Sequence, residues 1–287
     1  MIIKRVGGKT KISNWIVSNS PAGNIFVDVF GGSGAVLEEV INSVNKCRFV
    51  YNDLDDKVYN FFNTLKNNPN ELSHLISLTP YSRKFFNHCF SLLKNKDKFN
   101  ELTNLDKSVA FLVVNRQSFG AKMSKDWSIT RDGEINYKTW SSLPEYIFKV
   151  YNTWKNVYLE NLNYIDLFKK WDSENSIFYC DPPYESVEDD YYDVNKDEGF
   201  NHIELFENLQ HLKGSYFVSY YGGTNDDEDS DLLKLYKNSG CNIIRKSVKK
   251  HLSNQIEKQS VIETLIIKNK TNKFLLGKKL KHCGIIE

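Results

Sequence analysis

The 287-residue sequence lacks any apolar run near the roughly 20 residues that a membrane-spanning helix needs. Its first residues, Met-Ile-Ile-Lys-Arg, do not have the pattern of a secretory signal peptide. The five cysteines are scattered and include no Cys-x-x-Cys pair, which argues against a zinc site and favours a reducing compartment. We therefore expect a cytoplasmic protein without a metal site and without a membrane partner.

Two common nucleotide-binding motifs are incomplete. Gly7-Gly8-Lys9-Thr10 looks like the end of a phosphate-binding P-loop, but Ile3 stands where that motif needs glycine, which excludes a nucleoside triphosphatase. The glycine loop at residues 31–34 is too compact for the Gly-x-Gly-x-x-Gly of a dehydrogenase. A glycine turn that leads into a helix still offers N–H groups to a ligand and allows close backbone approach.

Net charge is also nearly absent, at +2, but it is unevenly distributed. Residues 181–231 hold 15 acidic and 2 basic side chains. Residues 61–155 hold 8 acidic and 14 basic side chains, and residues 232–287 hold 3 acidic and 13 basic ones. A neutral total does not exclude nucleic acid if the two basic blocks converge on one groove. Ordinary solvated surface charge is the alternative interpretation.

The most informative stretch is Ile177–Tyr184, an apolar strand pattern that ends in Asp-Pro-Pro-Tyr. Proline cannot donate to a sheet ladder, so the strand ends near Asp181, at the edge where open α/β sheets bind ligands. Asp181 and the carbonyl of Pro182 are two acceptors that Pro183 helps to hold rigidly, and Tyr184 offers a stacking face. Such a site suits a planar ring with an exocyclic amino group.

A strand, glycine loop and helix occur earlier, at Ile25–Phe30, Gly31-Gly32-Ser33-Gly34 and Ala35–Asn42. The glycines allow the backbone to approach a ligand. A second strand, Arg48–Tyr51, leads to Asp53, an acid placed to accept from a ribose hydroxyl pair. These features predict a site for an adenosine-type cofactor.

Between residues 58 and 156 the alternation of strands and helices stops, and a mainly helical pattern with net positive charge takes over. We interpret residues 58–156 as an inserted recognition domain, residues 1–57 and 157–269 as the catalytic domain, and residues 270–287 as a basic tail. Planar and basic side chains in the insert suit contacts to phosphates and base edges. The candidates for contacts to DNA are Arg116, Gln117, Ser118, Phe119 and Lys122.

Further strand patterns predict an α/β fold with a Rossmann-like, mostly parallel sheet of about seven strands and an antiparallel edge. They are residues 157–160, 216–221, 242–248 and 261–267, in addition to those above. The acidic stretch Glu185–Glu198 has few apolar groups, and we expect it to form a loop beside the site. Tyr191 in that stretch is a candidate cofactor contact.

Taken in order, these residues resemble the Dam-type (D12) adenine-specific DNA methyltransferases over nearly the whole chain up to Asn269. Arg5-Val-Gly-Gly-Lys9 looks like the N-terminal cofactor motif of that family, although the family often has an aromatic residue where Arg5 stands. Asp28-Val-Phe-Gly-Gly-Ser-Gly34 looks like its glycine motif and Asp181-Pro-Pro-Tyr184 like its catalytic signature. Asn52-Asp53 resembles its ribose-binding acid, and Tyr164-Ile165-Asp166 the motif that borders the cofactor's adenine.

The resemblance implies the methyltransferase fold that binds S-adenosylmethionine, with transfer of a methyl group to N6 of an adenine flipped out of duplex DNA. It also implies a bacterial or phage-encoded protein, a monomer or weak dimer, with a cognate restriction endonuclease as a possible partner. The expected catalytic residues are Asp181, Pro182, Pro183 and Tyr184. The expected cofactor-binding residues are Arg5, Gly7, Lys9, Asp28, Phe30, Gly31, Gly32, Ser33, Gly34, Asp53, Ile165, Asp166, Asp181 and Tyr191.

Two alternatives stay open. An amino-methyltransferase acting on RNA, or on glutamine in protein, also places an acid or amide before Pro-Pro-Tyr, although the glutamine enzymes usually carry Asn there. A DNA-binding homologue that has lost catalysis would keep the same fold, but all the motif residues are present in this sequence.

Overall fold

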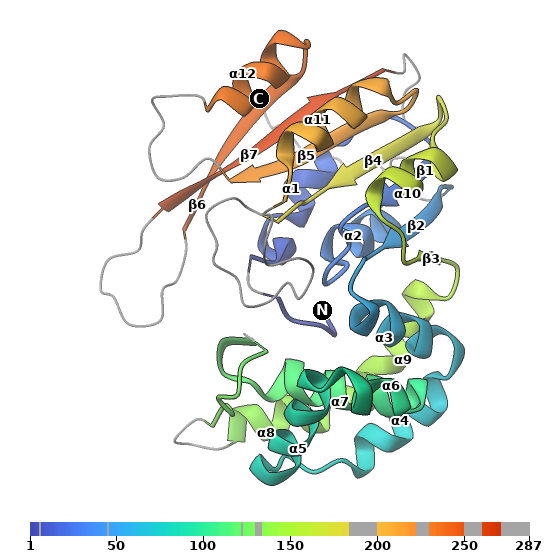
Figure 1. Cartoon of the computed structure of the whole chain (residues 1–287), viewed down its shortest axis with the longest axis vertical. Helices are drawn as coiled ribbons and strands as arrows, with labels where there is room; N and C mark the ends of the chain where they lie inside the picture. The colour runs from blue at the N-terminus through green and yellow to red at the C-terminus, as the bar shows by residue number, and fades with distance from the viewer. Residues whose placement is uncertain are drawn as a thin grey trace, which may run out of the picture.

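Seven strands form one sheet in the order β3-β2-β1-β4-β5-β7-β6, shown in the computed structural model in Figure 1. Strand β7 is antiparallel to both of its neighbours, and all other pairs are parallel. The predicted mostly parallel sheet is thus confirmed, with the antiparallel strand one position inside the edge formed by β6. The strands are β1 (Ile25–Asp28), β2 (Arg48–Asn52), β3 (Tyr158–Glu160), β4 (Ser176–Cys180), β5 (Ser215–Tyr221), β6 (Asn242–Lys249) and β7 (Ser260–Lys268).

The structure describes residues 1–5, 7–44, 46–121, 123–129, 134–183, 200–221, 230–249 and 260–270. Several predicted features lie outside these residues, namely Lys122, Tyr184, Tyr191, the acidic stretch 185–198 and the tail from residue 271 onward. Within these ranges, none of the helices has the length and apolar character needed to cross a membrane.

Alternate side chains along the strands pack into two apolar layers, because successive strand residues point to opposite faces. Phe26, Tyr179 and Phe217 belong to one layer, and Val27, Phe178 and Tyr216 to the other. The first layer is covered by α1 (Ser13–Ser18), which follows the short helix η1 (Lys9–Lys11), by α2 (Ala35–Ser43) and by the helices that follow β2. The second is covered by α10 (Tyr164–Trp171), α11 (His202–His211) and α12 (Asp231–Asn238).

The chain between β2 and β3 is helical, as the sequence pattern predicts, and Figure 1 shows these helices grouped at one end of the molecule. Helix α7 is their centre: nine of its residues are buried, and Thr103 caps its first turn by accepting from the Asp106 N–H. The apolar cluster of this region is continuous with the first layer under the sheet, so the division into two domains stays a prediction. The helices are α3 (Asp56–Asn67), α4 (Pro69–Leu78), α5 (Arg83–Lys94), α6 (Lys96–Glu101), α7 (Asn104–Gln117), η2 (Phe119–Ala121), α8 (Glu134–Ser141) and α9 (Leu143–Trp154).

The first residues of the chain connect this helical region to the sheet. Ile2 and Ile3 are fully buried in the shared core. The side-chain amide of Asn115, near the end of α7, exchanges two hydrogen bonds of 2.8 Å with the backbone N–H and C=O of Lys4. Arg116 donates to the Met1 carbonyl at 3.3 Å. The segment that leads into the glycine turn is therefore fixed to the helical region before it reaches the sheet.

Candidate active site

Three carboxylates gather where β1, β2 and β4 end. Asp28, the last residue of β1, pairs in register with Tyr51 on one side and Tyr179 on the other. Asp53 and Asp181 each follow two residues later on those neighbouring strands, so both project from the same edge. The sheet order reverses between β1 and β4, and open α/β sheets bind ligands at such a switch point.

The glycine loop closes tightly over this edge. The Gly31 N–H donates to the Asn52 carbonyl and the Gly34 N–H to the Gly31 carbonyl, both at 2.8 Å. Gly34 has φ +72°, and a Cβ there would lie 2.4 Å from the Trp154 ring, so no larger residue fits. Ser33 between them is buried. The loop thus turns directly from β1 into α2, with its backbone at the switch point.

Asp53 is held by the loop and by its own turn. Its Oδ2 accepts from the Gly32 N–H at 2.8 Å, and its Oδ1 accepts from the Asp55 N–H at 2.9 Å. Burial raises the pKa of Asp53, and the nearby Arg5 guanidinium opposes that rise. A carboxylate oxygen can accept two hydrogen bonds, so each oxygen of Asp53 retains acceptor capacity for a ribose hydroxyl.

Arg5 lies beside this acid rather than on an aromatic ring. Its Nη2 is 3.4 Å from Asp55 Oδ2 and 4.0 Å from Asp53 Oδ2. The position where the D12 pattern often has an aromatic residue is therefore used here for charge. The positive charge of the guanidinium offsets the negative charges of the two acids after β2. These ion pairs account for the position of the Arg5 side chain without a stacking contact.

Asp28 is the most deeply buried acid of the three, at 1% exposure. Its Oδ1 has no hydrogen-bond partner among the described residues. Burial first, and then repulsion from Asp181 and Asp53, raise the pKa of Asp28 well above its usual range. An unsatisfied buried acceptor costs free energy, so this oxygen is suited to meet a cationic or N–H-bearing ligand.

Asp181 is paired with a residue that we predicted to bind the cofactor. The Nζ of Lys9 lies 2.9 Å from Asp181 Oδ1, and it also donates to the Gly7 carbonyl at 3.3 Å. The Lys9 side chain is only 3% exposed, whereas the Asp181 side chain is 22% exposed. Pro182 is buried and Pro183 half-buried, which fixes the chain after the carboxylate. The sequence contained no signal for this pairing, because 172 positions separate the two residues.

Three further residues that we expected to bind the cofactor, Phe30, Ile165 and Asp166, divide into an apolar pair and a polar one. Phe30 and Ile165 are half-buried at the rim of the second apolar layer. The Phe30 ring lies 6.0 Å from Tyr164 and 5.5 Å from Phe200. Asp166 points to solvent, with a side chain 63% exposed, and pairs with Lys169 one helical turn on. Phe30 and Ile165 therefore pack against the second apolar layer, while Asp166 lies outside it.

The residues predicted to contact DNA lie around the end of α7 and differ in how far they are buried. Gln117 and Ser118 are buried, at 0% and 4% exposure. Gln117 Oε1 accepts from the Trp127 indole N–H, and Ser118 Oγ accepts from the Met123 N–H, so both side chains support a hairpin instead of facing outward. Arg116 is half-buried against Met1. Phe119, in contrast, is 57% exposed.

That hairpin is a structural feature that the sequence did not reveal. Ser118 and Trp127 form an antiparallel bridge, and the Phe119 N–H donates to the Asp126 carbonyl at 2.7 Å. The Arg83 guanidinium lies 5.1 Å from the Trp127 ring centre. The exposed Phe119 side chain is thus carried by a hydrogen-bonded turn whose partner residue, Trp127, packs against a cation.

Asn52 is a second residue whose role the sequence reasoning missed. Its side-chain N–H₂ donates to the carbonyls of Val29 and Leu162, and its Oδ1 accepts from the Leu162 N–H. The hydrogen bonds of this amide connect the loop after β1 to the loop after β3, next to Asp53. The position of Asn52 at the end of a strand, directly before Asp53, is the feature of the sequence that could have indicated this role.

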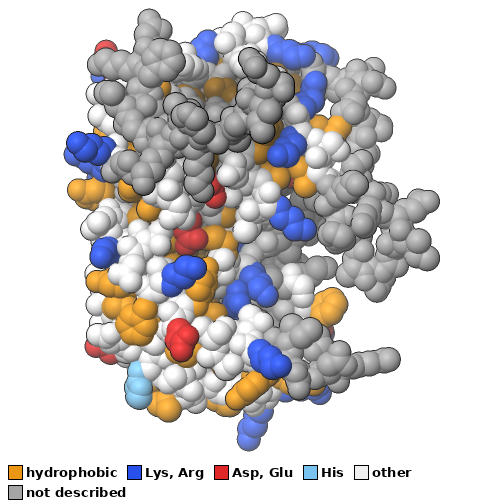
Figure 2. All heavy atoms as spheres, turned by 180° about the vertical axis from the view of Figure 1, so that it is seen from behind, with side chains coloured by type: hydrophobic (Ala, Val, Ile, Leu, Met, Phe, Trp, Pro, Cys, Tyr) orange, Lys and Arg blue, Asp and Glu red, His pale blue; other side chains and the backbone are white. Residues whose placement is uncertain are grey.

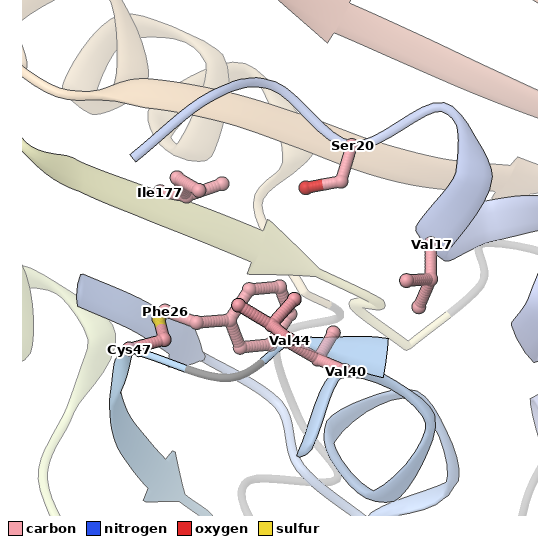
Figure 3. A pocket seen from close by; sticks show the side chains of 7 residues that line it. All are labelled: Val17, Ser20, Phe26, Val40, Val44, Cys47 and Ile177. Atoms are coloured by element: carbon pink, nitrogen blue, oxygen red, sulfur yellow. The ribbon is translucent and has the colours of Figure 1, made fainter. Parts of the chain in front are cut away.

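A small apolar hollow elsewhere in the molecule has no part in this arrangement. Figure 3 shows it between α1, α2 and the sheet, where Phe26 and Ile177 lie near the starts of β1 and β4, at the edge opposite the carboxylates. Burial raises the pKa of Cys47 in its wall to about 11, so this thiol is unreactive at neutral pH. Its lining residues are Val17, Ser20, Phe26, Val40, Val44, Cys47 and Ile177.

Comparison with known proteins decides the family. A family model described as D12 class N6 adenine-specific DNA methyltransferase matches residues 6–261. The chain belongs to this family. The match spans the glycine turn, the glycine loop, Asp53 and the Asp-Pro-Pro-Tyr signature in one alignment, so the protein is a methyltransferase of the D12 class.

The search of curated proteins by sequence finds no match. Among solved structures, a precorrin-6y C5,15-methyltransferase from Geobacter metallireducens has 8% identity, covers 91% of this chain and 87% of its own, and has a TM-score of 0.39. A precorrin-8w decarboxylase from Methanobacterium thermoautotrophicum has 10% identity, coverages of 92% and 91%, and a TM-score of 0.38. An rRNA methylase from Streptococcus thermophilus has 12% identity, coverages of 92% and 99%, and a TM-score of 0.33. The assignment to the D12 class rests on the family match alone.

Proposed function

We propose that this D12 protein transfers a methyl group from S-adenosylmethionine to the exocyclic N6 amine of adenine in duplex DNA. The observation that carries the proposal is the position of Asp181. Its carboxylate stands at the end of β4, across the switch point from the glycine loop and Asp53. A methyl acceptor at Asp181 and an adenosine-type donor at Asp53 would thus meet at one edge of the sheet.

The cofactor would supply a methyl group on a positively charged sulfonium. The acids at this edge fit that charge, because the buried Oδ1 of Asp28 has no partner among the described residues and Asp53 and Asp181 lie nearby. Asp53 would accept from the ribose hydroxyls, and Phe30 with Ile165 would pack on the adenine ring. We keep Arg5, through its contact with Asp53, and the backbone of residues 31–34 in the cofactor site.

On the acceptor side, the chain would bind and aim the amine. The lone pair of an adenine amine is delocalised into the ring, so the amine is a poor nucleophile. Asp181 and the Pro182 carbonyl would accept its two N–H bonds and favour a more tetrahedral nitrogen, with the lone pair directed at the methyl carbon. Positioning and electrostatics of this kind need no covalent enzyme intermediate.

Duplex DNA as the substrate is supported by the surface. Figure 2 shows a face on which Lys and Arg side chains extend from the sheet end of the molecule to the helical end, with Asp and Glu side chains less frequent. Exposed Phe119 and half-buried Arg116 would contact the DNA. Flipping the target base costs a few kcal/mol. Stacking on an aromatic side chain, worth about 1–3 kcal/mol per base, would offset part of that cost.

We expect cofactor binding to release a proton from Asp28. The pKa of Asp28 is raised by burial and by the acids around it, and a cationic ligand favours its ionised form. Affinity should therefore increase as the pH rises through that raised pKa and become constant above it. Calorimetric titration of S-adenosylmethionine in buffers of different ionisation enthalpy measures the proton release.

The Asp28→Asn variant is the matched control, because it keeps the size of the side chain and removes its titration. It should release fewer protons on binding and lose that part of the pH dependence. An unchanged proton count in Asp28→Asn would assign the titration to another group, with Asp53 the first to examine.

The function itself is tested by incubating the full chain with labelled S-adenosylmethionine and unmethylated duplex DNA, then mapping methyladenine by modification-sensitive sequencing. We expect label at one short repeated motif. Parallel reactions contain structured RNA and total protein as acceptors. Label on RNA or protein but not on DNA would replace the proposed substrate, and cofactor binding without transfer to any acceptor would indicate an inactive homologue.

A further inference from the structure

The basic block at residues 232–287 has no part in the arrangement described so far. Its first strand is β6, which contains no acidic residue and carries Arg245 next to Lys246. Figure 1 shows β6 on the side of the sheet away from β2 and β3, the two strands between which the helical region lies in the chain. That region holds the other basic block. The two blocks therefore flank the central strand β4, which leads to Asp181, from opposite sides.

The strand register places Lys246 at the same edge and on the same face of the sheet as Asp181. Because β7 is antiparallel to both β5 and β6, β6 runs in the same direction as β4 and β5. Asp181 follows β4 level with Ser219 of β5, and the pairing through β7 continues that row to Ile244 of β6. Lys246 lies two residues nearer the edge than Ile244, and strand alternation gives the two side chains the same face, that of the first apolar layer.

Lys246 lies over an aromatic ring at this edge. Its Nζ is 5.6 Å from the centre of the Trp15 ring, which belongs to α1. Trp15 is half-buried against the first apolar layer, whereas Lys246 is exposed. Glu263, the register partner of Lys246 on β7, is half-buried, so the more exposed of the two charges is the positive one. A lysine side chain that is already oriented by a ring loses less conformational entropy when it binds an anion than one that extends freely into water.

The segment that carries Trp15 also contacts the carboxylate of the candidate acceptor site. Lys9, in η1, lies 2.9 Å from Asp181 Oδ1, and Trp15 follows in the next helix. Lys11, between them in sequence, is exposed and adds a second cation to the segment. The chain from η1 to α1 therefore runs from Asp181 to Lys246, and it connects the acceptor site to the basic strand at the edge of the sheet.

We propose that Lys246, supported by Trp15, contacts a backbone phosphate of the bound DNA, on the side of the target base away from the helical region. The proposal rests on the proposed function, because it takes DNA as the ligand and Asp181 as the site of the target base. The DNA backbone fits this surface, because its phosphates form a regular row of single negative charges. A phosphate contact positions the duplex and carries no base identity, so Lys246 adds affinity without adding sequence specificity.

The spacing of the strands predicts which phosphate is contacted. Three strand spacings, from β4 through β5 and β7 to β6, and two residues along β6 separate the level of Asp181 from Lys246, which amounts to about 16 Å. Phosphates of one DNA strand recur about every 3.4 Å along the helix axis. A duplex that lies across the strand ends would thus place the contact roughly four to five nucleotides from the target base.

The test measures binding of a fluorescent duplex of about 30 base pairs to the full chain, by anisotropy between about 50 and 200 mM salt. Lys246→Met keeps an unbranched side chain over Trp15 and removes the charge. We expect the slope of log affinity against log salt concentration to become shallower by about 0.9, the value for one phosphate contact. Affinity at about 0.1 M salt should fall about 3- to 10-fold, and Lys246→Glu should bind more weakly still.

Two further variants separate this contact from general effects. Lys234→Met removes one charge from the same basic block, but Lys234 lies on α12, which covers the other face of the sheet. It should keep the wild-type slope, which would exclude an effect of net charge alone. Trp15→Leu keeps the Lys246 charge and removes its support, so affinity should fall while the slope stays near that of the wild type. Thermal unfolding of each variant shows whether the fold is retained.

Duplex length checks where the contact falls. Duplexes that end about three or about eight base pairs beyond the methylated adenine, on either side, include or omit the predicted phosphate. The wild type should bind the shorter flank more weakly on one side, and Lys246→Met should bind both flanks equally on that side.

The two proposals fail in different ways. Equal salt slopes for the wild type and Lys246→Met would overturn the DNA contact, even if the wild type methylates DNA. A Lys246-dependent slope without methyl transfer to DNA would instead refute the proposed function and support the DNA-binding surface.

Discussion

Asp181→Ala should reduce methyl transfer at least 100- to 1,000-fold, about the loss expected when a charge-directed acceptor is removed from a transition state. The alanine variant loses one of the three acids near the sulfonium charge but keeps the glycine loop, Asp53 and Arg5, so its affinity for S-adenosylmethionine should fall far less than its transfer rate. Rapid-quench transfer to DNA and equilibrium titration of the cofactor measure the two quantities separately. Near-normal transfer by Asp181→Ala would refute the assignment of this carboxylate to the acceptor amine.

Asp181→Asn is the informative companion. Asparagine retains an acceptor oxygen of the same reach but has no negative charge, so it distinguishes the hydrogen bond from the electrostatic effect. We expect a rate between those of alanine and the wild type. An asparagine variant as slow as the alanine variant would assign most of the effect to charge.

The buried lysine behind Asp181 complicates a simple interpretation of the alanine variant. Removing the carboxylate takes away the acid that lies 2.9 Å from the Lys9 ammonium, whose side chain is 3% exposed, and a buried charge that loses its counter-charge destabilises a protein. Thermal unfolding should therefore accompany every rate. Adding Lys9→Met to Asp181→Ala should recover stability without recovering transfer, which would separate folding from catalysis.

The parts of the site that follow from local chain chemistry could be predicted from sequence. A Pro-Pro pair must end a strand, glycines must form the tight loop, and an acid at the next strand end must lie at the same edge. The structure brings Asp28, Asp53 and Asp181 together at the ends of neighbouring strands in this way. The seven strands of the sheet also agree with the predicted α/β pattern, whereas their order in the sheet was not predicted.

The parts that depend on long-range contacts could not be predicted. Nothing local to Lys9 indicates that its ammonium group meets Asp181, since a glycine turn before a lysine is equally compatible with a phosphate or a cofactor. Gln117 and Ser118 have polar side chains in a basic stretch, yet the hairpin that buries them is closed by Trp127, ten positions after Gln117. Asp166 followed a family motif, but its helical position turns it towards Lys169 and solvent.

The second large effect is expected at Gly31. A Cβ on this residue would lie 2.1 Å from the Tyr51 ring, far closer than atoms can approach. Tyr51 cannot yield: it is fully buried, its ring centre lies 4.8 Å from Phe62 and 5.0 Å from Trp154, and its hydroxyl donates to the Gly32 carbonyl at 2.6 Å. We expect Gly31→Ala to cost about 3 kcal/mol or more, an overpacking effect that lowers the melting temperature by about 6 °C or more.

Gly32→Ala is the matched control, because it adds the same methyl group one position later in the same loop. Gly32 has φ +51°, but the nearest atom to a Cβ there would be Arg5 Cδ at 3.6 Å, which is ordinary contact. The left-handed backbone alone costs about 1–2 kcal/mol. Denaturant unfolding of both variants measures the difference, and equal losses would show that loop conformation, rather than contact with Tyr51, sets the requirement for glycine.

A double variant identifies the clash directly. Tyr51→Leu removes the ring that the added methyl group would meet, at the cost of a cavity in the core. If the clash is the cause, Gly31→Ala combined with Tyr51→Leu should lose less stability than the two single changes added together, since neighbouring substitutions are not additive. The loop backbone that we propose to approach the cofactor is fixed by this same contact, so Gly31→Ala should also weaken cofactor binding. Additive losses in stability would place the constraint elsewhere in the loop.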